Sequence, residues 1–375
     1  MNLYQSWLAS LSHVGNAAKR KMMIHGLSAE NIYGMSRQEL SALSFLKKKQ
    51  IDQILRQHDL TLAERLLEKL KTEGALAVTI EDEEYPHLLL QIRDAPYALY
   101  YYGTLPKPSM RLGALVGARR CTPYGANCAY DISRDLSARG FGVVSGLASG
   151  IDAASHRGAL DAGKATYAFL ACGPDICYPK ENLPIYQRIL TQGAVLSEFP
   201  PGIPPKPQYF PSRNRLISGA CEFVIVAEAK ERSGSLITAD FALEQGRDVW
   251  AVPGRITDPL SAGTNRLIAQ GASPFLSRET FFADLSDFPG SGQPSPSAAL
   301  LAEEDDGMII KREPSLFLEK EEMLVYSCFD FYPKSIQQVQ SETGEELFSL
   351  LSIIMRLCNL GLIRETFTNQ YIRLR

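Results

Sequence analysis

The feature that most constrains this chain of 375 residues is a change in the spacing of its apolar residues near Leu112. From there on, short apolar runs alternate with amphipathic segments that are long enough to form helices. Strands that are apolar on both faces are typical of a parallel sheet covered by helices, because each parallel connection needs a crossover helix. The middle of the chain therefore predicts an α/β fold, an extended Rossmann-like parallel sheet with helices on both faces. The expected strands are Leu112–Gly117, Gly142–Ser145, Ala165–Ala171, Ala194–Ser197, Phe223–Ala227, Val249–Val252 and Ser273–Leu276.

The segments on either side of this core have different patterns. Residues 1–75 repeat their apolar positions at helical spacing and predict an all-α domain, which is SAM-like or helix-hairpin-helix-like. The stretch Thr79–Leu105 is expected to be a connector into the sheet. Residues 284–315 are rich first in Pro, Ser and Gly and then in acidic residues, which predicts a flexible acidic linker. Residues 316–375 are expected to form three helices and two strands, a winged helix. The predicted domains are 1–75, 76–283, 284–315 and 316–375.

Composition and charge exclude several classes of protein. The net charge of −3 argues against a surface coated with basic residues. Residues 110–280 carry 18 Lys and Arg against 15 Asp and Glu, whereas the rest of the chain carries 21 against 27, so a nucleic-acid site is expected to be a local patch. No apolar stretch approaches the roughly 20 residues that span a bilayer. The seven cysteines form no CxxC pair, so neither a structural zinc nor a redox motif is expected. An odd number of scattered cysteines fits a reducing compartment, which predicts a cytoplasmic location.

The turns that follow the expected strands carry the candidate functional residues. In an open parallel sheet, ligands bind in the crevice beyond the carboxyl ends of the strands. Glycines there let the backbone approach a ligand, arginines offer a planar fork to phosphate, and aromatic rings can stack on bases. We expect a phosphate-binding site, most simply for the backbone of single-stranded DNA. Its candidate residues are Gly117, Arg119, Ser145, Gly146, Gly150, Lys206, Phe210, Arg213, Asn214, Arg215, Ser233, Gly234 and Ser235.

Several alternatives stay open at this level. The chain lacks the GxGxxG and GxxxxGK[ST] patterns, which disfavours a dinucleotide or a nucleoside triphosphate as the ligand. Tight-turn geometry alone would explain many of the glycines. Because Arg213 and Arg215 flank Asn214, one of them could face outward while the other pairs with a helix end. Asp152 and His156 stand four residues apart and could form an acid–base pair, although no nucleophile accompanies them.

Taken together, the motifs resemble those of the DprA/Smf family (DNA processing protein A). The match covers the whole of 112–275, and it departs from the family pattern at Ala118 and Ser155, where one small residue replaces another. The motifs that carry it, in order, are Gly117–Arg119, Ser145–Asp152, Tyr178–Pro179, Ser197–Glu198, Phe210–Arg215, Ser233–Ala239, Ala251–Gly254 and Leu267–Ala272.

The resemblance implies a protein that binds single-stranded DNA without enzymatic turnover. Members dimerise, protect incoming DNA and load the RecA recombinase during natural transformation, and no metal or cofactor is implied. By analogy, Arg119 contacts a backbone phosphate, and the segment from Lys206 to Arg215 lines the DNA groove with Phe210 against a base. The rival interpretations are a nucleotide-hydrolysing enzyme of a related Rossmann-like fold, and a small-molecule sensor with a DNA-reading winged helix. The third helix of that C-terminal domain opens with Glu345–Glu346, which suits a protein contact better than a DNA groove.

Overall fold

The structure is a computed structural model that describes residues 1–286, 322, 325, 326, 328, 329, 334–360, 362–367 and 370–373. The chain divides into two compact units. The first comprises residues 1–264 and 274–304, and the second comprises residues 265–273 and 305–375. Within the described residues, none of the helices combines the length and the apolar character needed to cross a bilayer.

The first 75 residues are helical, as their apolar spacing predicts. Side-chain oxygens of Asn2, Ser28 and Ser36 accept hydrogen bonds from the first turns of three helices, and the left-handed backbone of Gly74 ends the sixth. Trp7 and other apolar side chains are buried between the helices. The helices are α1 (Leu3–Ser10), α2 (Asn16–Ile24), α3 (Ala29–Gly34), α4 (Arg37–Ala42), α5 (Lys48–Arg56) and α6 (Thr61–Glu73).

A mostly parallel sheet of nine strands forms the core of the first unit, and all seven expected strands are present in it. The strand order is β1-β2-β6-β5-β4-β3-β7-β8-β9. The strands from β6 to β8 in that order run parallel, whereas β1 and β2 join the β6 edge antiparallel. The strands are β1 (Leu76–Thr79), β2 (Ala98–Gly103), β3 (Leu112–Val116), β4 (Gly142–Ser145), β5 (Thr166–Phe169), β6 (Ala194–Ser197), β7 (Phe223–Val226), β8 (Asp248–Ala251) and β9 (Ser273–Pro274).

The connector prediction for Thr79–Leu105 is wrong, because this segment contains β2 and the end of β1. Leu76 pairs with Tyr101, and Tyr100 pairs on its other side with Ser197 of β6. The apolar and aromatic run of β2 supplies a strand pattern, but the prolines around it hide the signal. Short antiparallel strands extend the edge here without a crossover helix. A pattern of strands that alternate with helices therefore does not include them.

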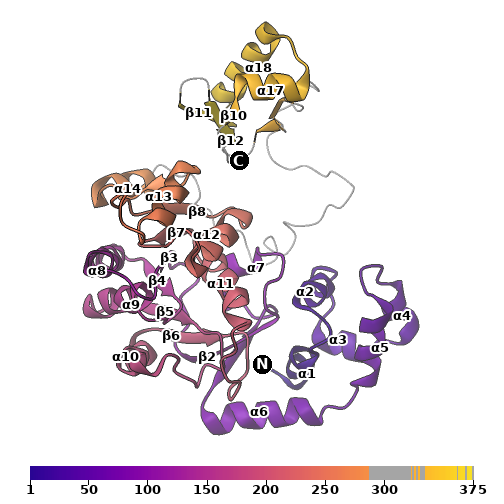
Figure 1. Ribbon diagram of the computed structural model, residues 1–375. Coiled ribbons are helices and arrows are strands. Elements are labelled where there is room, and N and C mark those ends of the chain that lie inside the picture. Colours follow the sequence, from indigo (N-terminus) through magenta and orange to yellow (C-terminus); the bar gives the residue numbers. More distant parts are fainter. Residues whose placement is uncertain are drawn as a thin grey trace. The chain divides into compact units, whose positions relative to one another are not determined.

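Helices cover both faces of the sheet (Figure 1). Helices α8, α9 and α10 lie on one face, and α11 and α12 lie on the other. Thr122 caps α8 and Ser233 caps α12, as their positions before the helices predict. The bounds are α7 (His87–Leu90), α8 (Pro123–Ala138), α9 (Ile151–Asp161), η1 (Lys180–Asn182), α10 (Leu183–Gln192), α11 (Tyr209–Gly219), α12 (Gly234–Glu244), α13 (Ala262–Ala269) and α14 (Arg278–Ser286).

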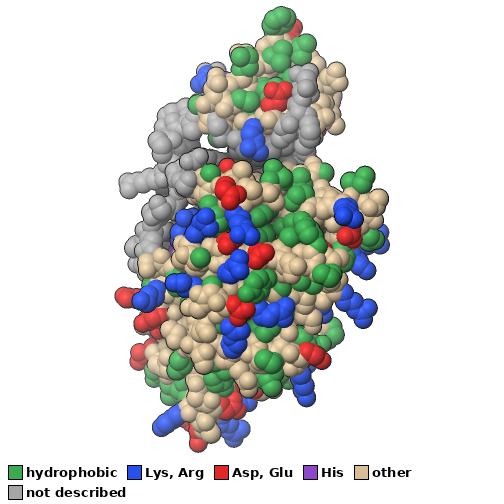
Figure 2. All heavy atoms as spheres, turned by 90° about the vertical axis from the view of Figure 1, so that its left-hand side faces the viewer, with side chains coloured by type: hydrophobic (Ala, Val, Ile, Leu, Met, Phe, Trp, Pro, Cys, Tyr) green, Lys and Arg blue, Asp and Glu red, His purple; other side chains and the backbone are tan. Residues whose placement is uncertain are grey.

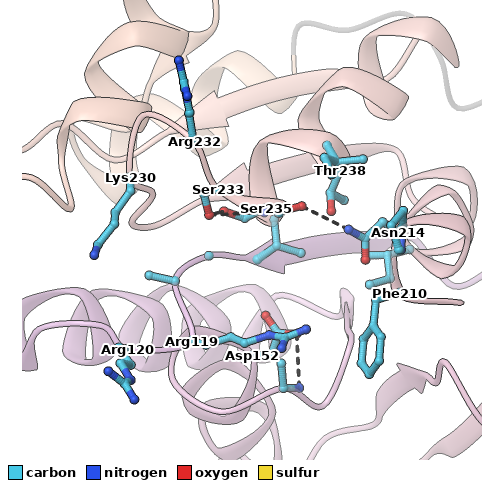
Figure 3. Close-up of a pocket in the computed structure, with 18 of the residues that line it drawn as sticks. Arg119, Arg120, Asp152, Phe210, Asn214, Lys230, Arg232, Ser233, Ser235 and Thr238 are labelled. Atoms are coloured by element: carbon cyan, nitrogen blue, oxygen red, sulfur yellow. Dashed lines mark hydrogen bonds between the residues drawn. The ribbon is translucent and has the colours of Figure 1, made fainter. Parts of the chain in front are cut away.

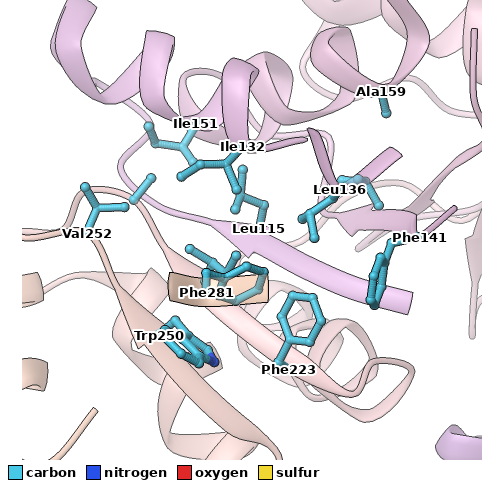
Figure 4. Close-up of a cluster of buried hydrophobic side chains, with 14 of the residues drawn as sticks. Leu115, Ile132, Leu136, Phe141, Ile151, Ala159, Phe223, Trp250, Val252 and Phe281 are labelled. Atoms are coloured by element: carbon cyan, nitrogen blue, oxygen red, sulfur yellow. The ribbon is translucent and has the colours of Figure 1, made fainter. Parts of the chain in front are cut away.

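The main apolar core lies between the sheet and helices α8 and α9, and side chains of α14 pack into it. Phe281 of α14 is fully buried against Phe223 of β7 and Trp250 of β8 (Figure 4). Leu285, one helical turn further along, is buried in the same cluster. This burial explains why the helix continues through residues 284–286, which the sequence assigns to the linker. The helix thus extends three residues past the expected start of the linker, and the rest of the predicted linker lies outside the described residues.

The second unit contains a small antiparallel sheet with helices. Its three strands have the order β10-β12-β11, and apolar side chains of both helices pack into one core. The second and third expected helices and both expected strands are present, whereas the first expected helix lies largely outside the described residues. The elements are β10 (Lys334–Ser335), α17 (Ile336–Thr343), α18 (Leu347–Asn359), β11 (Ile363–Phe367) and β12 (Gln370–Arg373). The winged-helix assignment stays a prediction.

Candidate nucleic-acid interface

The strand order places a crevice between β3 and β7. From β3 the chain moves outward through β4 and β5 to β6, and it then returns to add β7 and β8 on the other side of β3. The connections after β3 and β7 therefore diverge, and such a switch point is where open parallel sheets bind ligands. A pocket of about 340 Å³ opens there (Figure 3). Its walls are residues after β3, the start of α9, the first half of α11 and the start of α12.

Four exposed cations surround the opening of this pocket. They are Arg119 and Arg120 after β3, and Lys230 and Arg232 after β7. Among the residues that the structure describes, none of the four forms an ion pair. In Figure 3, Arg120 and Lys230 lie on the opposite side of the opening from Phe210. The pocket walls hold five cationic side chains and one acidic one, so the site carries the positive potential that an anionic ligand requires.

The cations elsewhere on this unit are differently arranged. On the face that carries α8, α9 and α14, basic side chains lie among acidic ones (Figure 2). Several of these are paired, with 2.8 Å between Arg188 and Asp161 and 2.7 Å between Arg278 and Asp135. Unlike that face, the pocket is a local basic patch. The modest net charge of residues 110–280 predicts such a patch.

Phe210 is the aromatic side chain of the pocket. The guanidinium carbon of Arg119 lies 5.1 Å from the centre of its ring. The adjacent Tyr209 instead packs against Phe199, with ring centres 4.3 Å apart, and the Lys206 ammonium lies 5.6 Å from the Tyr209 ring. Of the two neighbouring aromatics, Phe210 therefore faces the pocket, while exposed Lys206 lies outside its walls.

The N-terminus of α12 forms one wall of the pocket. Ser233 caps this helix by accepting a hydrogen bond from the Ser235 backbone N–H at 3.4 Å, and the two hydroxyls lie 2.8 Å apart. The Asn214 side chain donates to the Gly234 carbonyl at 3.1 Å and so joins α11 to this turn. The N-terminal end of a helix carries a partial positive charge, which favours an anion next to Lys230 and Arg232.

Arg213 lies at the floor of the pocket and has a structural role. Its side chain is only 4% exposed, and its Nη1 donates to the carbonyls of Gly146 and Phe169, both at 2.7 Å. The guanidinium thereby joins α11 to the ends of β4 and β5. Burial raises the pKa of Asp152, and the positive charge of Arg213 counteracts this shift. Because its donors are directed into the protein, we do not retain Arg213 as a contact to DNA phosphate.

Arg215 is also held inside the protein, on another side of α11. It forms ion pairs of 2.6 Å with Glu198 and 2.9 Å with Asp94. Burial raises the pKa of Glu198, and the positive charge of Arg215 counteracts this shift. The sequence left open which of the two arginines faces outward, and the structure shows both of them buried. We therefore do not propose Arg215, like Arg213, as a contact to DNA.

The turn after β4 is occupied by the protein's own carboxylate. Asp152 accepts hydrogen bonds from the backbone N–H groups of Gly146 at 3.1 Å and Ala148 at 3.3 Å. The buried Ser145 hydroxyl donates to the Leu115 carbonyl at 2.6 Å. Gly150 has a φ of +78°, and a Cβ there would lie 2.3 Å from the Ala118 carbonyl oxygen. The turn is needed for close packing, so we do not propose Ser145, Gly146 and Gly150 as contacts to DNA.

A second internal carboxylate occupies the N-terminus of α8. Glu228 is buried and accepts hydrogen bonds from the Thr122 backbone N–H, at 2.9 Å, and from the Thr122 hydroxyl. A Cβ on Gly125 would lie 2.2 Å from the Glu228 carboxyl carbon, so glycine makes room for the carboxylate. Gly117 is similarly close-packed, since its Cβ would lie 2.7 Å from Ile151. An external anion would have to displace Glu228 to reach this helix end.

Asp152 and His156 do not form an acid–base pair. The Nδ1 of His156 lies 2.8 Å from the hydroxyl of Thr166, which itself donates to the Val143 carbonyl at 2.8 Å. Since that hydroxyl has one hydrogen, Nδ1 must be the donor to it. Burial lowers the pKa of His156 to about 3, so the ring is neutral. Among the described residues, no three His, Cys, Asp or Glu side chains are grouped so as to hold a metal ion.

The structure brings together eight of the thirteen residues expected from the sequence. Gly117, Arg119, Phe210, Arg213, Asn214, Ser233, Gly234 and Ser235 line the pocket, whereas Ser145, Gly146, Gly150, Lys206 and Arg215 do not. The candidates expected from the sequence do not include Arg120, Lys230 and Arg232. These three residues nevertheless stand in the same turns as the candidates Arg119 and Ser233. The signal that could have identified them is the presence of two cations within six residues after each of the two strands at the switch point.

Comparison with known proteins gives consistent results. A family model described as DNA recombination-mediator protein A matches residues 76–286. The DNA processing protein DprA of Bacillus subtilis is 41% identical over 225 residues, which are 60% of this chain and 75% of that protein. The crystal structure of DNA processing protein A from Streptococcus pneumoniae superposes with a TM-score of 0.67 at 35% identity, covering 76% of this chain and 98% of that one. A structure of the Helicobacter pylori protein, which concerns its single-stranded DNA binding mode, gives 0.51 at 29% identity, covering 56% and 95%.

Proposed function

Because the chain belongs to the DNA recombination-mediator protein A family, the DprA/Smf proteins, we propose that it binds single-stranded DNA in the pocket between β3 and β7. The observation that carries this proposal is one pocket that is lined by Phe210 and by four exposed cations, none of which forms an ion pair within the described residues. Arg119, Arg120, Lys230 and Arg232 can each neutralise a phosphate, while Phe210 offers its ring to a base. Several cations together with an aromatic ring suit a polymer of phosphates and bases better than they suit a single nucleotide.

The single acidic residue among the pocket walls supports binding without turnover. A nucleotide hydrolase needs a carboxylate that is free to act at the glycosidic bond. Asp152 instead accepts two backbone hydrogen bonds in a closed turn, and Glu228 behind the turn is engaged by Thr122. Releasing either carboxylate would leave buried backbone donors unpaired, at a cost of about 1–3 kcal/mol for each group. The geometry thus disfavours the nucleotide hydrolase.

The test is the salt dependence of binding to a labelled single strand, measured by fluorescence anisotropy. Contact between four cations and four phosphates predicts a slope of log K against log salt of about −3, because each contact to a single strand contributes about −0.7. Arg120→Ala and Arg232→Ala should each weaken binding to every sequence and make the slope shallower by about 0.7. Arg188→Ala is the matched control, since Arg188 is an exposed cation already paired with Asp161.

Two results would contradict the proposed site. One is a wild-type slope near zero, which would mean that phosphate neutralisation does not drive binding. The other is an unchanged slope in both pocket variants together with a reduced slope in Arg188→Ala, which would place the DNA on another face. Free base released from nucleoside monophosphates would favour the hydrolase instead.

The wider role follows from the family resemblance and is part of the same proposal. It comprises protection of incoming DNA, loading of the RecA recombinase during natural transformation, a homodimeric assembly and a cytoplasmic location. A winged-helix fold for the C-terminal domain also belongs here, supported by its helices and small antiparallel sheet. If the sensor hypothesis were right instead, duplex binding would disappear when residues 316–375 are deleted.

A further inference from the structure

A second aromatic ring lies next to Phe210, outside the pocket walls. Tyr178 belongs to the segment between β5 and η1, and 44% of its surface is exposed. The centre of its ring lies 5.7 Å from that of Phe210, and the two planes are inclined by 57°. Two rings from segments that are distant in the sequence therefore form one continuous aromatic surface beside the pocket.

The segment that carries Tyr178 is firmly attached to the domain. The Gly173 backbone N–H donates to the Ile203 carbonyl at 2.8 Å, and the Tyr186 hydroxyl donates to the Pro174 carbonyl at 2.6 Å. On the other side of Tyr178, the Asn182 side chain donates to the Leu147 carbonyl at 2.8 Å. These bonds fix the segment at both ends, so a ligand that uses the Tyr178 ring pays little of the entropy cost of ordering a loop.

The position of the ring distinguishes it from an ordinary surface tyrosine. Single exposed aromatics are common and need no explanation. This one contacts the aromatic residue of the proposed site, whose other neighbour is the Arg119 guanidinium at 5.1 Å. Cation, first ring and second ring thus follow one another in space. A nucleic-acid strand presents phosphates and bases in just such close succession.

The inclination between the rings restricts what can bind across them. Bases that lie flat on Phe210 and Tyr178 would be inclined to one another by a similar angle. Neighbouring bases would therefore have to leave their mutual stack, which a flexible single strand allows. A duplex keeps its base pairs parallel and would lose stacking energy at that step.

We propose that Tyr178 is a second base-stacking residue, so that the site takes two consecutive bases of a single strand, one on Phe210 and one on Tyr178. This inference rests on the proposed function. It adds a contact that is independent of phosphate. Loss of the Tyr178 ring should weaken binding about fivefold, the lower end of the range for one stacked base, because the ring is already partly covered by Phe210.

The experiment compares wild type, Tyr178→Leu and Tyr178→Phe in the full chain, with a labelled 20-nucleotide oligothymidine at several salt concentrations. Tyr178→Leu keeps apolar bulk but removes the ring, whereas Tyr178→Phe keeps the ring and removes only the hydroxyl. We expect Tyr178→Leu to bind about fivefold more weakly at every salt concentration, with an unchanged salt slope. Tyr178→Phe should bind like wild type, and both variants should keep the wild-type thermal unfolding midpoint.

Photo-crosslinking supplies a direct readout. An oligonucleotide with 5-iododeoxyuridine should crosslink to the peptide that contains Tyr178 in wild type, and that crosslink should be absent in Tyr178→Leu. Wild-type affinity in Tyr178→Leu would overturn the inference while leaving the proposed function intact. A weaker affinity with a shallower salt slope would also overturn it, because it would indicate a lost phosphate contact. If wild type itself showed no salt-dependent binding, the proposed function would fail and this inference with it.

Discussion

Replacing Arg213 by alanine should lower the stability of the folded protein, and any loss of DNA binding should result from that loss of stability. Arg213 stands in the segment of cations and aromatics that the sequence predicts to be the DNA groove. Its donors are nevertheless directed to the carbonyls of Gly146 and Phe169, and its charge faces the buried carboxylate of Asp152. The substitution thus removes a cation that donates to two buried carbonyls and that counteracts the burial of the Asp152 charge.

The size of the effect can be worked from these contacts. A hydrogen bond from a charged group contributes about 1.5–3 kcal/mol, and Arg213 donates two of them. Removing one partner of a buried charged pair costs about 3–5 kcal/mol, because the remaining charge is left uncompensated. We therefore expect Arg213→Ala to lower the free energy of unfolding by about 3–5 kcal/mol. A domain has about 5–15 kcal/mol in total, so the variant should be close to the limit of stability.

The assay is urea unfolding followed by tryptophan fluorescence. The chain has two tryptophans, Trp7 in the helical N-terminus and Trp250 in β8. In a Trp7→Phe background the signal comes from Trp250, which lies in the main core. Arg119→Ala is the matched control, since this exposed arginine should change stability by less than about 0.5 kcal/mol while weakening DNA binding.

One outcome would refute the structural role of Arg213. If Arg213→Ala unfolds at the wild-type urea concentration yet binds single-stranded DNA much more weakly, its guanidinium must contact the ligand. The two variants would then behave alike, and the difference in burial between Arg119 and Arg213 would have no functional meaning.

Two further predictions concern pH. Burial lowers the pKa of His156 to about 3, below its ordinary 6.5, so between these values the unfolded chain binds a proton that the folded one does not. The free energy of unfolding should fall by about 1.4 kcal/mol for each pH unit below 6.5. In His156→Leu, the urea midpoint should change less between pH 6.5 and 5 than it does in wild type. Burial also lowers the pKa of Lys19 from 10.5 to about 7. Stability should therefore rise between pH 7 and 10, and Lys19→Met should remove this rise; the same pH slope in Lys19→Met and wild type would contradict the assignment.

The sheet was predictable because its signal is local and repeated. Most of the expected strands are runs of buried residues, and Leu112–Val116 is buried along its whole length. The antiparallel edge was not predictable in the same way, since β1 and β2 make no crossover and stand among prolines. Their place in the sheet has a practical consequence. A fragment that starts at residue 80 would lose β1 and leave β2 unpaired on one side.

The candidate site was predictable as a region but not in its details. The motifs predict a site spread over several turns beyond the strand ends, and the pocket lies among two of them, after β3 and β7. What the sequence does not show is which way a side chain on α11 points. Arg213, Asn214 and Arg215 are consecutive, yet two of them are buried in separate polar networks and only Asn214 reaches the turn of α12. The partners of these networks, such as Asp94 and Phe169, are far away in the sequence.

The same limit explains why several glycine-rich turns look like phosphate sites when only some of them are free. A turn that presents backbone N–H groups suits a carboxylate of the protein as well as it suits a phosphate. Asp152 is six residues from Gly146, but Glu228 is 106 residues from Thr122, so its place at the start of α8 depends on the fold. With these two turns occupied from within, the start of α12 is the helix end that lines the pocket, beside Lys230 and Arg232. That placement, more than the number of glycine-rich turns, is why we propose a DNA site between β3 and β7.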